Sequence, residues 1–202
     1  MIQSKFSEGG IMFNLITLKD TIRIGPSKFG QPLEKAAYEE LRGKYEGLVD
    51  EDLGYVISVI KVDVSPYGRI IPGDGGTHHP VSFKILTFLP QLQEIIEGKV
   101  VEVADFGAFL RLGPVDALLH VSQLMDDFMS FDERQGVLLG KETGRTIQRE
   151  DSFRVRIIAV SFPKGRSSGK IGVTARQPML GKLEWIEKEV KSIESPAEEK
   201  VK

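Results

Sequence analysis

The sequence contains no cysteine, which removes several classes of protein chemistry at once. Without thiols the chain cannot form disulfides, use a cysteine nucleophile, or hold zinc or an iron–sulfur cluster through cysteine. Long apolar runs are also missing, and none approaches the roughly 18 residues that span a bilayer, so a membrane protein is not expected. A basic stretch followed by an apolar core is absent from the N-terminal residues, and we therefore expect a cytoplasmic protein.

Net charge is also small, at −2 over 202 residues, which argues against nonspecific coating of DNA. The charge is unevenly distributed, however. Between positions 151 and 176 one acidic residue, Asp151, stands against six basic residues, Arg154, Arg156, Lys164, Arg166, Lys170 and Arg176. A confined basic strip on a near-neutral chain is typical of a guided contact with nucleic acid, and the alternative is an ordinary solvated face.

Residues 1–11 lack the strand pattern that begins at Phe13, and we expect them to be disordered or a non-native extension. Glu8-Gly9-Gly10 resembles a purine-rich ribosome-binding sequence read through as protein. The hypothesis that follows is that Met12 is the native start. The intact mass of the native protein tests it.

Residues 12–92 predict a small antiparallel sheet with one main helix, an α+β domain. Strand patterns cover 13–24, 54–64 and 81–89, and they are rich in β-branched and apolar residues. A helix follows Pro32 because Leu33, Ala37, Leu41 and Tyr45 recur every four residues, and Gly47 provides its stop.

Two loops of this region are built from glycine and proline. They are the 25–30 loop, Gly-Pro-Ser-Lys-Phe-Gly, and the 68–76 loop, in which Ile70 and Ile71 stand close to the tip. Exposed isoleucines on such a tip favour docking into a pocket of a partner. The alternative is a long hairpin loop whose isoleucines fold back onto their own core, and the pattern leaves both open.

Residues 97–176 alternate in strands again, after a connector at 92–97. We expect strands at 98–104, 107–112, 117–121, 153–161 and 170–175, with an extra strand or short helix around 136–141. Short hairpins followed by a long third-to-fourth connection match the five-stranded OB-fold barrel. Residues 177–193 predict a C-terminal helix, from the spacing of Leu183, Ile186, Val190 and Ile193, and residues 194–202 a disordered tail.

No catalytic or metal-binding constellation is visible. His78 and His79 are adjacent on a strand, so they point to opposite faces, and no third ligand lies near them in sequence. The acidic residues between Asp126 and Glu133 lack the spacing of a calcium loop. We therefore expect a noncatalytic protein with no metal and no cofactor.

Four motifs of the second region resemble the RNA-binding OB module named after ribosomal protein S1. They are Gly98-x-Val100, Phe106-Gly107-Ala108-Phe109, Leu118-Leu119-His120-Val121-Ser122 and Lys170-Ile171-Gly172-Val173-Thr174. The chain departs from that pattern at Ala117, where the family usually has glycine, and at Ser161, where some RNA-binding members carry aspartate.

The first region narrows the resemblance. The 25–30 and 68–75 segments and the terminal run from Arg176 to Ile186, with its Leu-Glu-Trp-Ile, are similar to the E-prime stalk-subunit family of archaeal RNA polymerase. The eukaryotic counterpart is the seventh subunit of polymerase II. This resemblance implies docking of the tip loops on the RNA polymerase core near the clamp, a small helical protein as the stalk partner, and a barrel that faces the emerging single-stranded RNA.

The candidate RNA-binding residues are Phe106 and Phe109 for base stacking, His120 and Lys170 at positions where the family binds RNA, and Arg156 from strand alternation. For Phe109 the alternative is packing in the barrel core. The candidate docking residues lie in the two loops and are Pro26, Phe29, Arg69, Ile70, Ile71, Pro72, Gly73, Asp74 and Gly75. A free-standing RNA-binding factor in translation or RNA decay is the alternative function.

Overall fold

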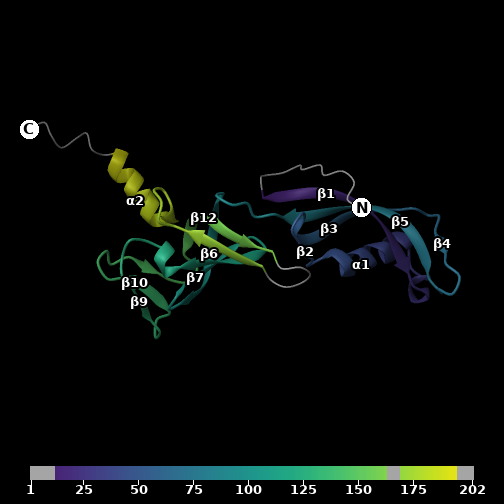
Figure 1. Ribbon diagram of the computed structural model, residues 1–202, viewed down its shortest axis with the longest axis horizontal. Helices are drawn as coiled ribbons and strands as arrows, with labels where there is room; N and C mark the ends of the chain where they lie inside the picture. The colour runs from purple at the N-terminus through teal and green to yellow at the C-terminus, as the bar shows by residue number, and fades with distance from the viewer. Residues whose placement is uncertain (1–11, 163–168, 195–202) are drawn as a thin grey trace, which may run out of the picture. The chain divides into compact units, whose positions relative to one another are not determined.

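The computed structural model describes residues 12–162 and 169–194, which fall into two compact units (Figure 1). Described residues up to Pro90, with Phe162, form the first unit, and those of 91–161 and 169–194 form the second. The expected extension at 1–11, the loop residues 163–168 with Lys164 and Arg166, and the tail residues 195–202 lie outside the described residues. No helix in the described ranges is long and apolar enough to cross a membrane.

The first unit is an antiparallel sheet with one main helix, as the sequence predicts. Its elements are β1 (Phe13–Ile24), the short 3₁₀ helix η1 (Pro26–Lys28), α1 (Leu33–Tyr45), β2 (Val49–Asp50), β3 (Gly54–Val64), β4 (Arg69–Ile70) and β5 (Thr77–Phe88). The strands follow the order β1-β5-β3-β2, and β4 pairs with the start of β5.

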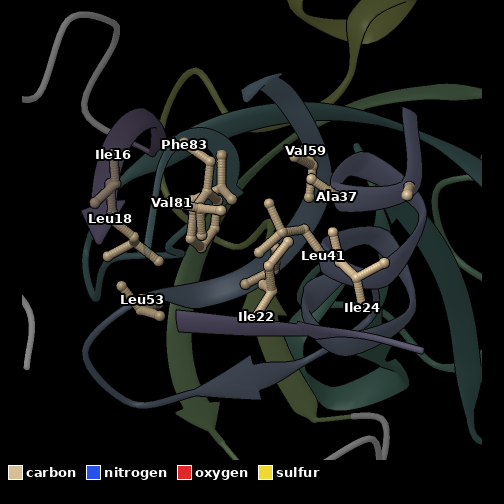
Figure 2. Packing of buried hydrophobic residues seen from close by; sticks show 13 residues of the cluster. Ile16, Leu18, Ile22, Ile24, Ala37, Leu41, Leu53, Val59, Val81 and Phe83 are labelled. Atoms are coloured by element: carbon tan, nitrogen blue, oxygen red, sulfur yellow. The ribbon is translucent and has the colours of Figure 1, made fainter. Parts of the chain in front are cut away.

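Helix α1 packs against one face of this sheet, on β3 and β1. Its Ala37 and Leu41 are fully buried with Ile16 and Phe83 of the strands, and Figure 2 shows these side chains gathered in one cluster. The apolar repeat of every four residues places these side chains on one stripe of the helix, which is why the helix buries this side.

Strand β5 begins at Thr77, four residues before the predicted start at Val81. The prediction stopped short because Pro80 lacks a backbone N–H and reads as a strand breaker. In the structure the ladder between β5 and β3 ends at Val81↔Val64, so Pro80 lies where β5 continues to pair with β1, opposite Thr21.

The second unit is a closed barrel followed by a helix, which confirms the predicted OB-like architecture. Its elements are β6 (Ile95–Ala104), β7 (Gly107–Leu112), β8 (Val115–His120), the short 3₁₀ helix η2 (Val121–Gln123), β9 (Met129–Asp132), β10 (Val137–Gly140), β11 (Thr146–Ile147), β12 (Ser152–Ser161), β13 (Lys170–Thr174), β14 (Gly181–Lys182) and α2 (Leu183–Glu194).

Five strands in the order β13-β8-β7-β6-β12 close because β12 also pairs with β13. Register shifts between Val100 and Glu102 in β6, and between Ile157 and Ala159 in β12, mark bulges that bend the sheet towards closure. The long third-to-fourth connection carries a separate sheet, β11-β10-β9, in which the segment expected around 136–141 is a strand.

Candidate RNA-binding face and docking tip

Strand alternation fixes the outer face of the barrel at β7 and β8. Ala108, Leu110 and Leu112 of β7 are fully buried, so the residues between them, Phe109 and Arg111, point outward. The carboxylate of Asp116, opposite on β8, accepts hydrogen bonds from the Arg111 guanidinium at 2.7 and 3.0 Å. This ion pair neutralises Arg111, and Phe109 is left as the half-exposed aromatic of the face.

The second aromatic ring of this face comes from the turn that precedes β7. Phe106 is 44% exposed, and its ring meets that of Phe109 edge to face with centroids 5.9 Å apart. The turn needs glycine at position 107, because a Cβ atom there would clash with the carbonyl oxygen of Leu119 and lie 3.0 Å from the Cα of His120. Backbone packing therefore brings the two phenylalanines together.

His120 is the exposed last residue of β8, opposite Gly107 in the β7–β8 register. Its Nδ1 accepts a hydrogen bond from the Ser122 backbone N–H at 3.2 Å and lies 2.8 Å from the Ser122 hydroxyl. A ring nitrogen that accepts a hydrogen bond carries no proton, so the neutral ring bears its proton at Nε2. The contact caps η2 and fixes the ring beside the phenylalanine turn.

Lys170 shares the outer face with this aromatic group. Gly172 of β13 pairs with Leu118 of β8, and Leu118 pairs with Phe109 of β7, so these three residues form one row across the barrel. Lys170 stands two residues from Gly172 on the same strand, exposed and opposite Ser161. The lysine is thus one row away from Phe109.

Arg156 lies apart from the aromatic group, on β12 between Thr174 of β13 and Ile95 of β6. Its buried neighbours Val155 and Ile157 make it point outward, and it is half-buried. Its Nε is buried and has no hydrogen-bond partner among the described residues. The structure thus gathers Phe106, Phe109 and His120, places Lys170 beside them, and sets Arg156 further round the barrel.

Arg176 is a residue of this region that the sequence showed only as part of the basic strip. Its Nη1 donates to the Ser122 carbonyl at 3.1 Å, and its Nη2 forms an ion pair with Asp126. Both groups line a groove of about 570 Å³ that also includes Asp105, next to Phe106. A basic residue just after a strand gives no sign of this contact, because the partner lies 54 residues earlier in the chain.

The two glycine- and proline-built loops of the first unit lie against each other. The Pro26 ring is 3.5 Å from the position that a Cβ atom on Gly75 would occupy. Phe29 is 53% exposed, Ile70 76% and Ile71 49%, so the isoleucines do not fold back onto the core. Arg69, Pro72 and Gly73 are exposed beside them, whereas Asp74 turns its carboxylate towards Arg23 and His78. We call this surface, Phe29, Ile70 and Ile71, the apolar tip.

Comparison with known proteins agrees with this division of the chain. Residues 19–75 match the family described as "SHS2 domain found in N terminus of Rpb7p/Rpc25p/MJ0397", and residues 89–172 match "S1 RNA binding domain". The DNA-directed RNA polymerase subunit Rpo7 of Saccharolobus shibatae is 41% identical over 175 residues, which cover 87% of this chain and 97% of that one.

Two further relatives extend the likeness. Rpo7 of Sulfolobus acidocaldarius is 40% identical and covers 89% of this chain and 97% of its own length. The DNA-directed RNA polymerase III subunit RPC8 of Bos taurus is 28% identical and covers 86% and 98%. The likeness spans both units and nearly the full length of these relatives, and the chain belongs to the family of DNA-directed RNA polymerase subunit Rpo7.

Proposed function

We propose that this chain is a noncatalytic subunit of DNA-directed RNA polymerase, with one unit that docks on the core enzyme and one that binds RNA. The observation that carries the docking part is the exposed apolar tip, because Phe29, Ile70 and Ile71 stand free on two ordered loops. A free-standing RNA-binding factor has no need of such a surface, whereas a tethered subunit needs a place to insert. The names of the relatives favour the same choice.

The RNA part of the proposal is supported by the chemistry of the barrel face. Two aromatic rings at right angles offer stacking surfaces for bases, at roughly 1–3 kcal/mol for each base. The exposed Lys170 attracts the phosphate backbone without reading the sequence. Because a subunit held on the polymerase meets the transcript at high effective concentration, this site works even with weak intrinsic affinity.

The finer parts of the proposal rest on the resemblance of the two loops and the terminal Leu-Glu-Trp-Ile run. They are a stalk that docks near the clamp, a small helical protein as the stalk partner, and the emerging single-stranded transcript as the ligand. The same proposal places the chain with the polymerase in the cytoplasm.

Purification from native extract through a tag on this chain tests the proposal directly. Recovery of the core polymerase subunits is the expected result, and their absence would overturn the assignment. Paired changes of Ile70→Asp and Ile71→Asp should release the core while binding to the helical stalk partner persists. A matched control is Leu139→Asp, because Leu139 is an exposed apolar residue on β10 of the other unit. If the isoleucine variant still holds the core, docking uses another surface.

A further inference from the structure

Asp74 stands in the exposed 68–76 loop, yet its carboxylate is occupied from within the chain. The Arg23 Nε donates to Oδ2 at 2.8 Å and to Oδ1 at 3.0 Å, and the Arg23 Nη2 donates to Oδ1. The His78 Nε2 lies 2.9 Å from Oδ2, and the Gly76 backbone N–H donates to Oδ1 at 3.0 Å. The carboxylate oxygens therefore have little capacity left for a group of another protein.

These partners come from segments that are far apart in sequence. Arg23 is the penultimate residue of β1, and His78 is the second residue of β5, opposite Arg23 in the β1–β5 register. His78 also pairs with Arg69 of β4, next to Ile70. Asp74 thus ties the loop back to the end of the sheet from which it emerges.

The rest of the loop is fitted around this contact. The Asp74 backbone N–H donates to the Ile71 carbonyl at 3.0 Å, which closes a turn directly behind the apolar tip. Gly76 leaves no room for a side chain, because a Cβ atom would lie 2.9 Å from the Ile24 carbonyl and 3.1 Å from the Arg23 guanidinium. The loop is therefore held at its base by packing as well as by charge.

The charge state of Asp74 suits this role at neutral pH. Hydrogen bonds from Arg23, then from His78 and the Gly76 N–H, hold the pKa of the Asp74 carboxyl far below its ordinary value. A carboxylate that accepts bidentate bonds from a guanidinium gives a stronger and more directional contact than a simple surface ion pair.

We infer that Asp74, Arg23 and His78 form an internal clasp that positions the apolar tip for docking, and that Asp74 itself does not contact the polymerase core. The inference rests on the proposed function. A tip that is already ordered loses less conformational freedom on binding, so the clasp increases affinity without adding a contact. Because the clasp lies at the surface, its loss affects the loop much more than the stability of the whole unit.

Binding of the full-length chain to core polymerase that lacks this subunit tests the inference. Asp74→Asn keeps the shape but removes the charge, and it should raise Kd by about tenfold while amide hydrogen exchange in residues 71–76 becomes faster. The matched control is Asp63→Asn, since Asp63 is an exposed aspartate on β3 outside the loop. We expect this control to bind like the original chain, with unchanged loop exchange.

A double-mutant cycle separates positioning from direct contact. Ile70→Ala should weaken binding strongly in the original chain and much less in the Asp74→Asn background, because the tip is then no longer held in place. For His78 the conservative change to Gln keeps an N–H donor for Asp74 and should restore most of the affinity that His78→Ala loses.

Two outcomes would overturn the clasp. Additive losses from Asp74→Asn and Ile70→Ala with unchanged loop exchange would make Asp74 a direct contact. Unchanged affinity in Asp74→Asn would leave the clasp without a role in docking. Failure of the original chain to bind the core is a different result, since it contradicts the proposed function rather than the clasp. The unfolding midpoint of each variant, compared with that of the original chain, shows that the fold is intact.

Discussion

The rings of Phe106 and Phe109 meet edge to face, with their planes at 86° and their centroids 5.9 Å apart. Phe106 comes from the turn between β6 and β7, and Phe109 comes from the outward side of β7. An edge-to-face pair is a favourable aromatic arrangement that holds both rings in fixed orientations. The half-exposed pair therefore presents a preformed surface on which bases stack.

Replacing Phe106 with alanine should weaken binding of single-stranded RNA, because one stacking surface is removed. Roughly 1–3 kcal/mol for each base corresponds to a loss of about 5- to 150-fold, and a double change with Phe109→Ala should lose more. Fluorescence anisotropy with a labelled oligonucleotide measures the loss. Phe29→Ala is the control, since Phe29 is an exposed phenylalanine of the other unit. Unchanged RNA binding in a folded double variant would remove the stacking role.

Gly107→Ala should destabilise the barrel, because the new Cβ atom clashes with the Leu119 carbonyl oxygen where β7 and β8 pair. Forcing an extra carbon into a packed site typically costs about 1–3 kcal/mol. Gly43→Ala gives the opposite expectation. Gly43 is an exposed helical residue with nothing within 4 Å of a built Cβ, so the change should stabilise α1 by up to about 1 kcal/mol. Thermal unfolding of both variants measures the two signs.

Strand alternation and turn chemistry were sufficient to predict the barrel, because both act over a few neighbouring residues. The β7 limits at Gly107 and Leu112 agree with the prediction, and so do those of β1 and β3. The stripe of apolar residues likewise predicted α1. Local pattern also narrowed the barrel aromatics to two residues. Their exposure then depended on which side of β7 faces the core, and that follows from alternation once one buried residue is known.

Contacts between distant segments could not be predicted in the same way. Nothing local to Asp74 identifies Arg23, 51 residues earlier, as the partner of its carboxylate. The interpretation of Asp74 as a docking residue came from its place in the loop, whereas its orientation depends on the β1–β5 register. The sheet β11-β10-β9 was also missed as a unit, because its strands have only two to four residues each and show too little alternation.

Asp127 should titrate well below an ordinary aspartate. Hydrogen bonds from the Thr143 hydroxyl at 2.6 Å and the Thr143 N–H at 3.0 Å lower the pKa of its carboxyl from 3.8 to about 2. Because the pKa in the folded state is lowered, these contacts stabilise the fold above pH 3.8 and lose that effect as the pH falls through about 2. The Thr143 amide signal, followed by NMR against pH, should move with a midpoint near 2. The Asp127→Asn variant should show no such step, and a midpoint at the ordinary aspartate value in the original chain would contradict the contact.

Lys182 and Asp151 form a nearly buried ion pair at the base of the C-terminal helix. The Lys182 Nζ lies 2.8 Å from the Asp151 Oδ1, and the side chains are 10% and 8% exposed. Burial lowers the pKa of Lys182, but the hydrogen bond and charge of Asp151 outweigh it and raise that pKa overall. Lys182 pairs with Phe153 in β12, whose ring meets Trp185 of α2 edge to face at 5.8 Å. The pair therefore lies where helix and barrel join.

Lys182→Met should destabilise the second unit by about 3 kcal/mol, because it leaves the Asp151 carboxylate buried without its counter-charge. Adding Asp151→Asn should recover much of that loss, since the neutral amide removes the buried charge and its oxygen still accepts the Gln148 N–H that donates to Asp151 at 2.9 Å. Arg111→Met is the control for an exposed pair, and it should cost less than about 1 kcal/mol. Urea unfolding of the four proteins, read by Trp185 fluorescence, gives these differences. A double variant no more stable than Lys182→Met alone would show that the lysine acts through packing of its chain rather than through its charge.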